Sequence, residues 1–271
     1  MRSIRSIFVP LLSFAVFAAP ACDSRVHLGA IGTGTANVLW SSTFEPGDLS
    51  EWLGDDEGGT FVENSSVGPT VTTDVVHAGH YAGKSTVVPM GMTSTCYFFR
   101  NQPSRTEAFY SAWFYIPSAS TVRGYLSLIH LRSSPTNDGM NVVAMWDFNI
   151  IPDPGVPGAL TSQLYNFATQ VNFGQLTPST PVVVPTDRWI HFEFLLVKAT
   201  DATGRISIWQ DDVNIIDAQN IITAETDWVQ WDVGAASNNM DPVPAAIYMD
   251  DAAISLSRLG SGNAAGDHVA P

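Results

Sequence analysis

Basic residues are scarce in this chain of 271 residues. It carries 12 Lys and Arg against 26 Asp and Glu, which gives a formal net charge of -14. Binding to nucleic acid requires clustered basic side chains that contact phosphates, so we expect no nucleic-acid partner. The same charge disfavours a polyanionic substrate unless a local basic site overcomes it.

Long apolar runs and helical patterns are also missing. The apolar run at 7–19 is too short for a membrane-spanning helix, which needs about 20 residues. Apolar residues do not recur three and four apart between helix caps, except in a single turn around 48–52, and no segment is repeated. The sequence therefore argues against helical bundles and repeat proteins.

The first 22 residues resemble a bacterial export signal. Two arginines precede the apolar run, and small residues at 19–21 lead to Cys22. This ending fits both a lipobox, with lipid attached to Cys22, and ordinary signal cleavage just before Cys22. A lipidated Cys22 would hold the protein on a membrane surface. Because lipidation would use Cys22, we expect the only other cysteine, Cys96, to be a buried free thiol without a disulfide.

Composition divides the chain into four parts. We expect a signal peptide at 1–21, a tether at 22–38, one domain at 39–259 and a flexible tail at 260–271. A hydrophobic content of 45% supplies a full core for one domain of this length. The protein is expected to be an exported monomer of the bacterial cell envelope, either lipid-anchored or secreted.

Short runs rich in β-branched and aromatic residues, separated by Gly and Pro turns, predict an all-β sandwich. The expected strands are 85–88, 95–100, 108–116, 125–132, 142–151, 162–167, 189–198, 205–210, 228–235 and 245–257. Strand side chains alternate between faces. The alternation at 125–132 places Leu126, Leu128, His130 and Arg132 together on one face.

Six segments along the chain carry a family resemblance. They are 44–52 (FEPGDLSEW), 76–84 (VHAGHYAGK), 109–117 (FYSAWFYIP), 187–193 (DRWIHFE), 204–212 (GRISIWQDD) and 248–255 (YMDDAAIS). Together they resemble the concanavalin A-like lectin/glucanase superfamily, and within it exported bacterial proteins related to polysaccharide lyases. The resemblance implies an antiparallel two-sheet jelly-roll β-sandwich from about 39 to 259. It does not select an activity, since this fold serves lectins, hydrolases, lyases and adhesion modules.

The chain departs from the patterns of active relatives. It has no Glu-x-Asp-x-x-Glu strand of a retaining glucanase. Alginate lyases of this fold carry an Arg-x-Glu-x-Arg strand, a Gln-x-His strand and a Tyr-x-Lys-x-Gly-x-Tyr strand. Residues 127–130 and 105–107 match such strands only in part, and the tyrosine-lysine strand is absent. Three hypotheses therefore stay open: a polysaccharide lyase, a non-catalytic glycan-binding module, and a surface adhesion or structural module.

A β-eliminating lyase that acts on uronates needs a group that neutralises the substrate carboxylate, a base and an acid. We expect His130 as the base, Arg132 or Asn149 as the neutralising group and Tyr165 as the acid. Histidine suits the base role because its ordinary pKa lies near neutrality. The alternative is that His130 is a polar residue at the edge of a groove and Arg132 a solvated strand end.

Binding to a sugar requires exposed aromatic rings with amides between them. The expected ligand-binding residues are Trp113, Tyr115, Trp146, Asn166, His191, Glu193, Trp209 and Gln210. For each tryptophan the alternative is burial in the core. For His191 and Glu193, two apart on one strand face, the alternative is a structural hydrogen bond.

Glu45, Asp48 and Asp251 form a candidate site for a structural Ca²⁺. Calcium takes six to eight oxygen ligands, which a turn and the final strand can supply. Jelly rolls that bind carbohydrate, which this chain resembles, often tie their two ends together with such a site. The alternative is a turn cap at one end and, at the other, carboxylates that protect an edge strand.

Overall fold

The computed structural model describes residues 38–64, 67–101, 105–136 and 143–262. These residues belong to one compact unit, Thr35–Pro271. The expected signal peptide, Cys22 and nearly all of the expected tether lie outside the described residues, as does most of the expected tail. Within the described part, no helix is long and apolar enough to cross a membrane.

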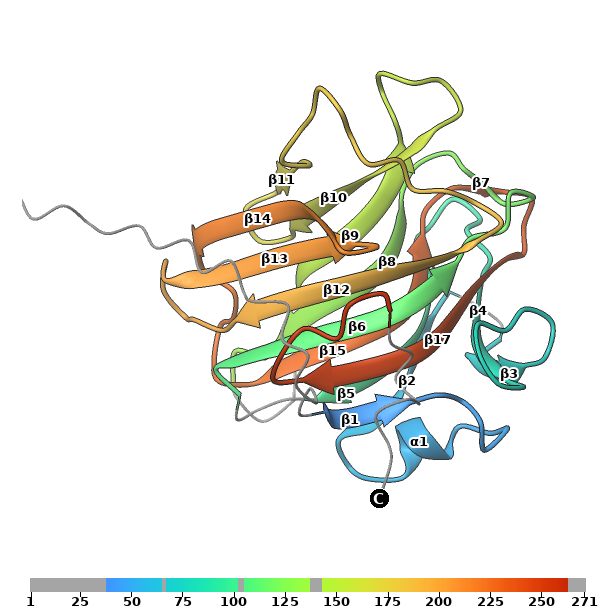
Figure 1. The fold of residues 1–271 in the computed structure, drawn as a ribbon, viewed down its shortest axis with the longest axis horizontal. Helices are drawn as coiled ribbons and strands as arrows, with labels where there is room; N and C mark the ends of the chain where they lie inside the picture. Colours follow the sequence, from blue (N-terminus) through green and yellow to red (C-terminus); the bar gives the residue numbers. More distant parts are fainter. Residues whose placement is uncertain (1–37, 65–66, 102–104, 137–142, 263–271) are drawn as a thin grey trace, which may run out of the picture. The chain divides into compact units, whose positions relative to one another are not determined.

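Two antiparallel sheets form the unit (Figure 1). Sheet A has the order β14 (Val213–Ile221), β13 (Gly204–Gln210), β12 (Trp189–Val197), β6 (Glu107–Tyr115), β17 (Ala245–Ser255), β4 (Ala82–Val87) and β3 (Thr70–Thr72), with β1 (Val38–Ser42) also paired to β17. Sheet B has the order β11 (Val171–Phe173), β10 (Leu160–Asn166), β9 (Val143–Pro152), β8 (Leu126–Ser133), β15 (Val229–Ser237), β5 (Ser94–Asn101) and β2 (Gly58–Glu63). A small third sheet pairs β16 (Met240–Asp241) with β7 (Thr121–Val122). The prediction of an all-β two-sheet sandwich is confirmed.

Every strand expected from the sequence is present within a few residues of its predicted ends. The strands that the sequence did not predict are β1, β2, β3, β7, β11, β14 and β16. Several have only two or three residues, too few for an alternating pattern to emerge. The predicted single helical turn is α1 (Ser50–Leu53).

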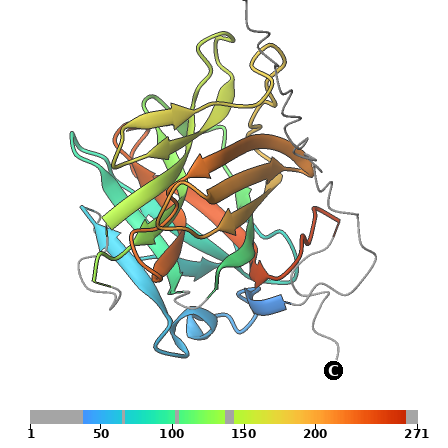
Figure 2. The ribbon, with the colours of Figure 1, turned by 90° about the vertical axis from the view of Figure 1, so that its left-hand side faces the viewer.

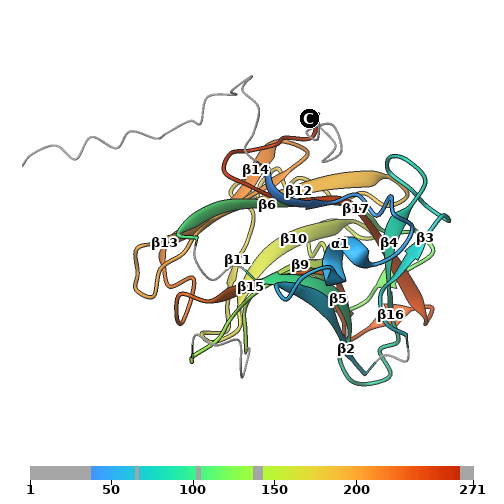
Figure 3. The ribbon, with the colours of Figure 1, turned by 90° about the horizontal axis from the view of Figure 1, so that it is seen from below.

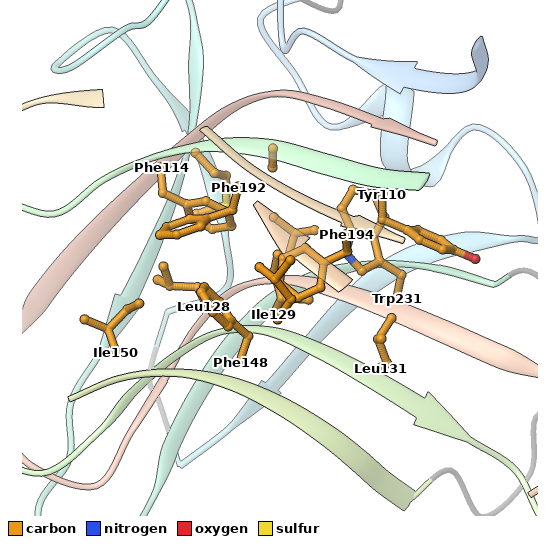
Figure 4. Packing of buried hydrophobic residues seen from close by; sticks show 14 of the residues in the cluster. Tyr110, Phe114, Leu128, Ile129, Leu131, Phe148, Ile150, Phe192, Phe194 and Trp231 are labelled. Carbon is orange, nitrogen blue, oxygen red and sulfur yellow. The ribbon is translucent and has the colours of Figure 1, made fainter. Parts of the chain in front are cut away.

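Aromatic and aliphatic side chains from the two facing sheets fill the core. The layers are seen edge-on in Figure 3, with β6, β12 and β17 above β9, β15 and β5. Phe148 of sheet B packs edge-on against Phe192 and Phe194 of sheet A, with ring centroids 4.8 and 5.1 Å apart (Figure 4). Burial of such rings is the main stabilising contribution to a sandwich of this kind.

A second aromatic cluster ties α1 to the sheets. The ring of Trp52 lies 4.6 Å from Trp40 of β1 and 5.1 Å from Phe98 of β5. Figure 2 shows that α1 and β1 lie at the same end of the sandwich. The segment around Trp52, singled out in the sequence, therefore contributes to packing.

The final strand, β17, lies inside sheet A between β6 and β4. The alternative that its carboxylates protect a sheet edge is therefore wrong. A β-bulge interrupts its pairing with β6 between Asp250 and Ala253, and Asp251 has a φ of 45°. Bulges redirect side chains, and here the bulge turns Asp251 toward His77, whose Nδ1 lies 2.7 Å from its Oδ2.

Candidate active site

The face of sheet B that points away from sheet A carries a buried polar row. In the central strand β8, His130 pairs directly with Asp232 of β15 and with Asp147 of β9. Asp147 in turn pairs with Tyr165 of β10. The side chains next to them along each strand, such as Trp231 and Phe148, point into the core. Four adjacent strands thus align four functional side chains.

A bulge in β8 determines which side chains face outward. The register shifts between Ser127 and Ile129, so that Leu128 and Ile129 both join the core. The predicted grouping of Leu126 and Leu128 with His130 is therefore wrong, because strict alternation does not hold across a bulge. His130 and Arg132 share a face as predicted, two residues apart beyond the bulge.

His130 is 7% exposed and both of its ring nitrogens have neighbours. Its Nε2 lies 2.9 Å from Tyr97 Oη, and Tyr97 Oη donates to the Ser127 carbonyl at 3.1 Å. A tyrosine hydroxyl has one proton, so Tyr97 accepts from His130 Nε2–H and Nδ1 is the unprotonated nitrogen. Arg132 Nη2 lies 3.4 Å from that Nδ1. Burial and the nearby Arg132 hold the pKa of His130 well below its usual value, so the ring is neutral near pH 7.

Arg132 lies between an acid and a ring. Its Nε lies 2.5 Å from Asp232 Oδ2. The Nε–H bond does not point at this oxygen, so the contact is an ion pair without a hydrogen bond. Its guanidinium stacks over Phe61 of β2, with 4.7 Å from Cζ to the ring centroid. The positive charge of Arg132 is therefore already paired before any ligand arrives.

Two carboxyl groups, one buried and one largely buried, flank this cation. Asp232 is completely buried, and Asp147 has a side chain that is 15% exposed. Burial raises the pKa of each to about 7, and the charge of Arg132 opposes both increases. The charge of Asp232 further raises the pKa of Asp147. The cluster can therefore hold or release a proton near neutral pH.

Asn149 and Tyr165 complete the outer face on the β9 and β10 side. Asn149 pairs with Ser127 and with Gln163, and is 5% exposed. Its Oδ1 has no hydrogen-bond partner within the described part of the chain. Tyr165 is partly exposed, one pairing step beyond Asp147. All four residues expected to act in catalysis lie on this one face.

Three residues of the cluster were missed from the sequence: Tyr97, Asp147 and Asp232. Each lies in an expected strand between residues that point into the core, at positions that alternation assigns to the opposite face. An ionisable residue inside an otherwise apolar strand was the available signal. That signal does not reveal which strands are neighbours, and the neighbours create the site.

Five expected ligand-binding residues lie elsewhere, on the outer face of sheet A. They are Trp113, Tyr115, His191, Glu193 and Trp209. The core sandwich separates them from His130, so the two sets cannot line one groove. They are instead covered in part by other segments. Trp113 is stacked under the ring of His77 at 4.0 Å, and the guanidinium of Arg258 lies 4.6 Å from the centre of the Trp209 ring.

His191 and Glu193 do not pair with each other in the structure. Glu193 is fully buried, with its carboxylate accepting from Arg258 Nε at 2.7 Å and from the Leu259 backbone N–H at 2.5 Å. Burial has the largest effect on the pKa of Glu193 and raises it. His191 packs near Trp113, and burial lowers its pKa to about 4. Glu193 thus fastens the segment after β17 onto sheet A.

The remaining expected ligand-binding residues are buried, Trp146 in the core and Asn166 and Gln210 at the ends of β10 and β13. Trp146 is 2% exposed and donates its indole N–H to the Ile222 carbonyl at 3.2 Å. The side-chain oxygen of Asn166 accepts from the Thr169 backbone N–H at 2.7 Å. Gln210 donates to the Val183 carbonyl at 2.8 Å. No face of these side chains is open to a sugar.

The residues expected to bind calcium have separate partners. Glu45 Oε1 accepts from the backbone N–H groups of His80 and Tyr81, and Asp48 accepts from that of Ser50. Asp251 pairs with a histidine nitrogen, as described above for β17. In the described ranges, no three His, Cys, Asp or Glu side chains are grouped as a metal site. One oxygen of each of these three carboxylates therefore already has a partner.

The calcium site therefore stays a prediction. Calcium that binds the folded state would raise the melting temperature by mass action. Melting of the purified protein in excess calcium and in excess chelator measures this directly. If the melting temperature is the same in calcium and in chelator, both for wild type and for Glu45→Gln, the calcium site is contradicted.

Comparison with known proteins gives one family and a set of similar folds. Residues 44–253 match the family described as polysaccharide lyase. The endo-beta-1,4-glucuronan lyase of the fungus Trichoderma reesei is 17% identical, with a TM-score of 0.54 over 81% of this chain and 96% of that one. The cellulose induced protein Cip1 is 18% identical, with a TM-score of 0.54 over 81% and 98%. The PL-14 alginate lyase of Aplysia kurodai is 11% identical, with a TM-score of 0.53 over 81% and 99%. No curated protein matches this chain.

Proposed function

The chain belongs to the polysaccharide lyase family, and we propose that it cleaves a uronate-containing polysaccharide by β-elimination on the outer face of sheet B. The observation that carries this proposal is the central row of side chains, in which a neutral His130 lies beside Arg132, Asp147 and Tyr165. Two of the solved structures with this fold are a glucuronan lyase and an alginate lyase, and glucuronan and alginate are polymers of uronates.

The reaction needs one proton removed and one supplied. In the proposed reaction, the unprotonated His130 Nδ1 takes the proton from C5 of the uronate. The electrons of that bond form the C4=C5 double bond while the C4–O bond breaks. Tyr165 gives its proton to the departing oxygen. Of the two residues expected to neutralise the carboxylate, Arg132 is paired with Asp232, so Asn149 would face the carboxylate, whose charge increases toward an enediolate as C5 loses its proton.

Non-catalytic binding of a glycan is the second hypothesis. It is favoured by the burial of His130, whose Nε2 is occupied by Tyr97 and whose lone pair faces Arg132. A binding protein would need the row only for hydrogen bonds to hydroxyl groups.

Incubation with a panel of polyuronates separates these two functions. β-Elimination creates an unsaturated uronate that absorbs in the ultraviolet, so growth of that absorbance with wild-type protein supports the lyase. Retention on a glycan array without any absorbance change on the whole panel supports the binding module and contradicts the lyase.

We also infer that the protein is exported, from the resemblance of residues 1–22 to an export signal. Lipid on Cys22 would place it on the membrane surface, and cleavage without lipid would release it. Fractionation of cells that express wild type or Cys22→Ser measures the difference. Equal membrane association of the two proteins would contradict the lipid anchor.

A further inference from the structure

The proposed substrate creates an electrostatic problem at this site. The row contains one permanent cation, Arg132, and it is already paired with Asp232. If both Asp232 and Asp147 were ionised, the row would carry a net negative charge before a uronate arrived. The chain as a whole carries a net charge of -14, so long-range attraction does not compensate. Some group other than Arg132 must accommodate the incoming carboxylate.

Asp147 is placed to do this. Its Oδ1 is buried 3.5 Å from His130 Nε2 and has no hydrogen-bond partner among the residues described. Since the side chain is 15% exposed and Oδ1 is not, the exposure belongs to the other atoms of the side chain, among which Oδ2 is the polar one. An ionised carboxylate in such a position loses hydration without gaining donors, whereas a protonated one loses little.

The groups around Asp147 come from every strand packed against it. They are Tyr97 of β5, Tyr125 just before β8, His130 and Arg132 of β8, Tyr165 of β10 and Asp232 of β15. Among these described neighbours Arg132 is the only group with a permanent positive charge, and it contacts Asp232 at 2.5 Å. That contact favours the ionised form of Asp232 over that of Asp147. When the pair holds one proton, the geometry places it on Asp147.

We propose that Asp147 binds the substrate in its protonated form and donates a hydrogen bond to the uronate carboxylate, so that binding of a uronate is coupled to the uptake of a proton. In this state Arg132 and Asp232 cancel, and Asn149 and Asp147 receive the carboxylate without a second negative charge nearby. This inference rests on the proposed function, because it concerns the uronate that such a lyase must bind.

The sign of the pH dependence follows from the pKa of about 7 at Asp147. Below this pH the carboxyl group is protonated and can donate. Above it the protonated fraction falls about tenfold per pH unit, so the dissociation constant for a uronate rises about tenfold per unit. The dissociation constant for a neutral oligosaccharide should not change with pH in this way.

Asp147→Asn tests this coupling, because an asparagine keeps a donor and stays neutral at every pH. The probe is a purified oligouronate, titrated by calorimetry from about pH 6 to about pH 8, across the range where the histidine and the acids change charge. We expect the wild-type dissociation constant to rise through this range and that of Asp147→Asn to stay flat. Asp56→Asn, which removes one exposed carboxylate from the same chain, should follow the wild type.

A second measurement needs no variant. Calorimetry of the wild type in two buffers of different ionisation enthalpy gives the number of protons taken up, and we expect uptake above pH 7 that approaches one. No uptake, or a parallel pH dependence in Asp147→Asn and wild type, would overturn the role of Asp147. Failure to bind any oligouronate would overturn it as well. Coupled binding without unsaturated product would keep this role and contradict the lyase, so the two results are distinguishable.

Discussion

Replacing His130 with alanine is expected to lower the rate of polysaccharide cleavage by about 10²–10⁴-fold, the usual contribution of a positioned base. The ring is neutral near pH 7 because burial and Arg132 depress its pKa, and its Nδ1 keeps the lone pair because Tyr97 holds Nε2–H. Removing it leaves no other neutral nitrogen base in the row. The measurement is the initial rate at which ultraviolet absorbance increases with the most rapidly cleaved polyuronate as substrate.

His80→Ala is the matched control for this experiment. His80 is exposed. Its backbone N–H donates a hydrogen bond to Glu45, and alanine keeps that N–H. The control should cleave at the wild-type rate, and both variants should melt cooperatively. A His130→Ala protein that is folded and cleaves as fast as wild type would rule out His130 as the base.

Truncation of Trp52 to alanine is expected to destabilise the fold by about 3–5 kcal/mol, as for other large aromatic residues in cores. Its side chain is completely buried and contacts Trp40, Phe98 and, at 6.2 Å, Phe44. The cavity would lie where α1 and β1 join the sheets. For a domain of this size the melting temperature should fall by about 10 °C.

Leu53→Ala provides the comparison at the neighbouring position of α1. Leu53 is 52% exposed, so its truncation should change the melting temperature by little. Similar losses in Trp52→Ala and Leu53→Ala would mean that the aromatic cluster around Trp52 does not stabilise the domain as the packing indicates.

Local chemistry determined the strands and part of the site. Alternating apolar residues predicted β12, where Phe192 and Phe194 face the core, because a strand exposes every second side chain to the same environment. The spacing of two between His130 and Arg132 likewise placed them on one face. These features depend on neighbours in the chain, so the sequence is sufficient to predict them.

The bulge in β8 marks where local reasoning fails. Strict alternation placed Leu128 beside His130, whereas one extra residue in the ladder turned Leu128 inward. A bulge depends on how β8 pairs with β9 and β15, and the single strand carries no mark of it. The same limit applies to β17, whose central position depends on pairing with β6 and β4.

By itself, then, the sequence determined an all-β sandwich, its family resemblance and the common face of His130 and Arg132. Only the tertiary structure decided that Tyr97, Asp147 and Asp232 join them, and that Trp113 and His191 lie on the opposite sheet. The physical reason is that strand order is set by pairings between segments far apart in the chain, such as β8 with β15. Side-chain alternation fixes the face within a strand, but the strand order fixes which charges meet, and with them the pKa values of the site.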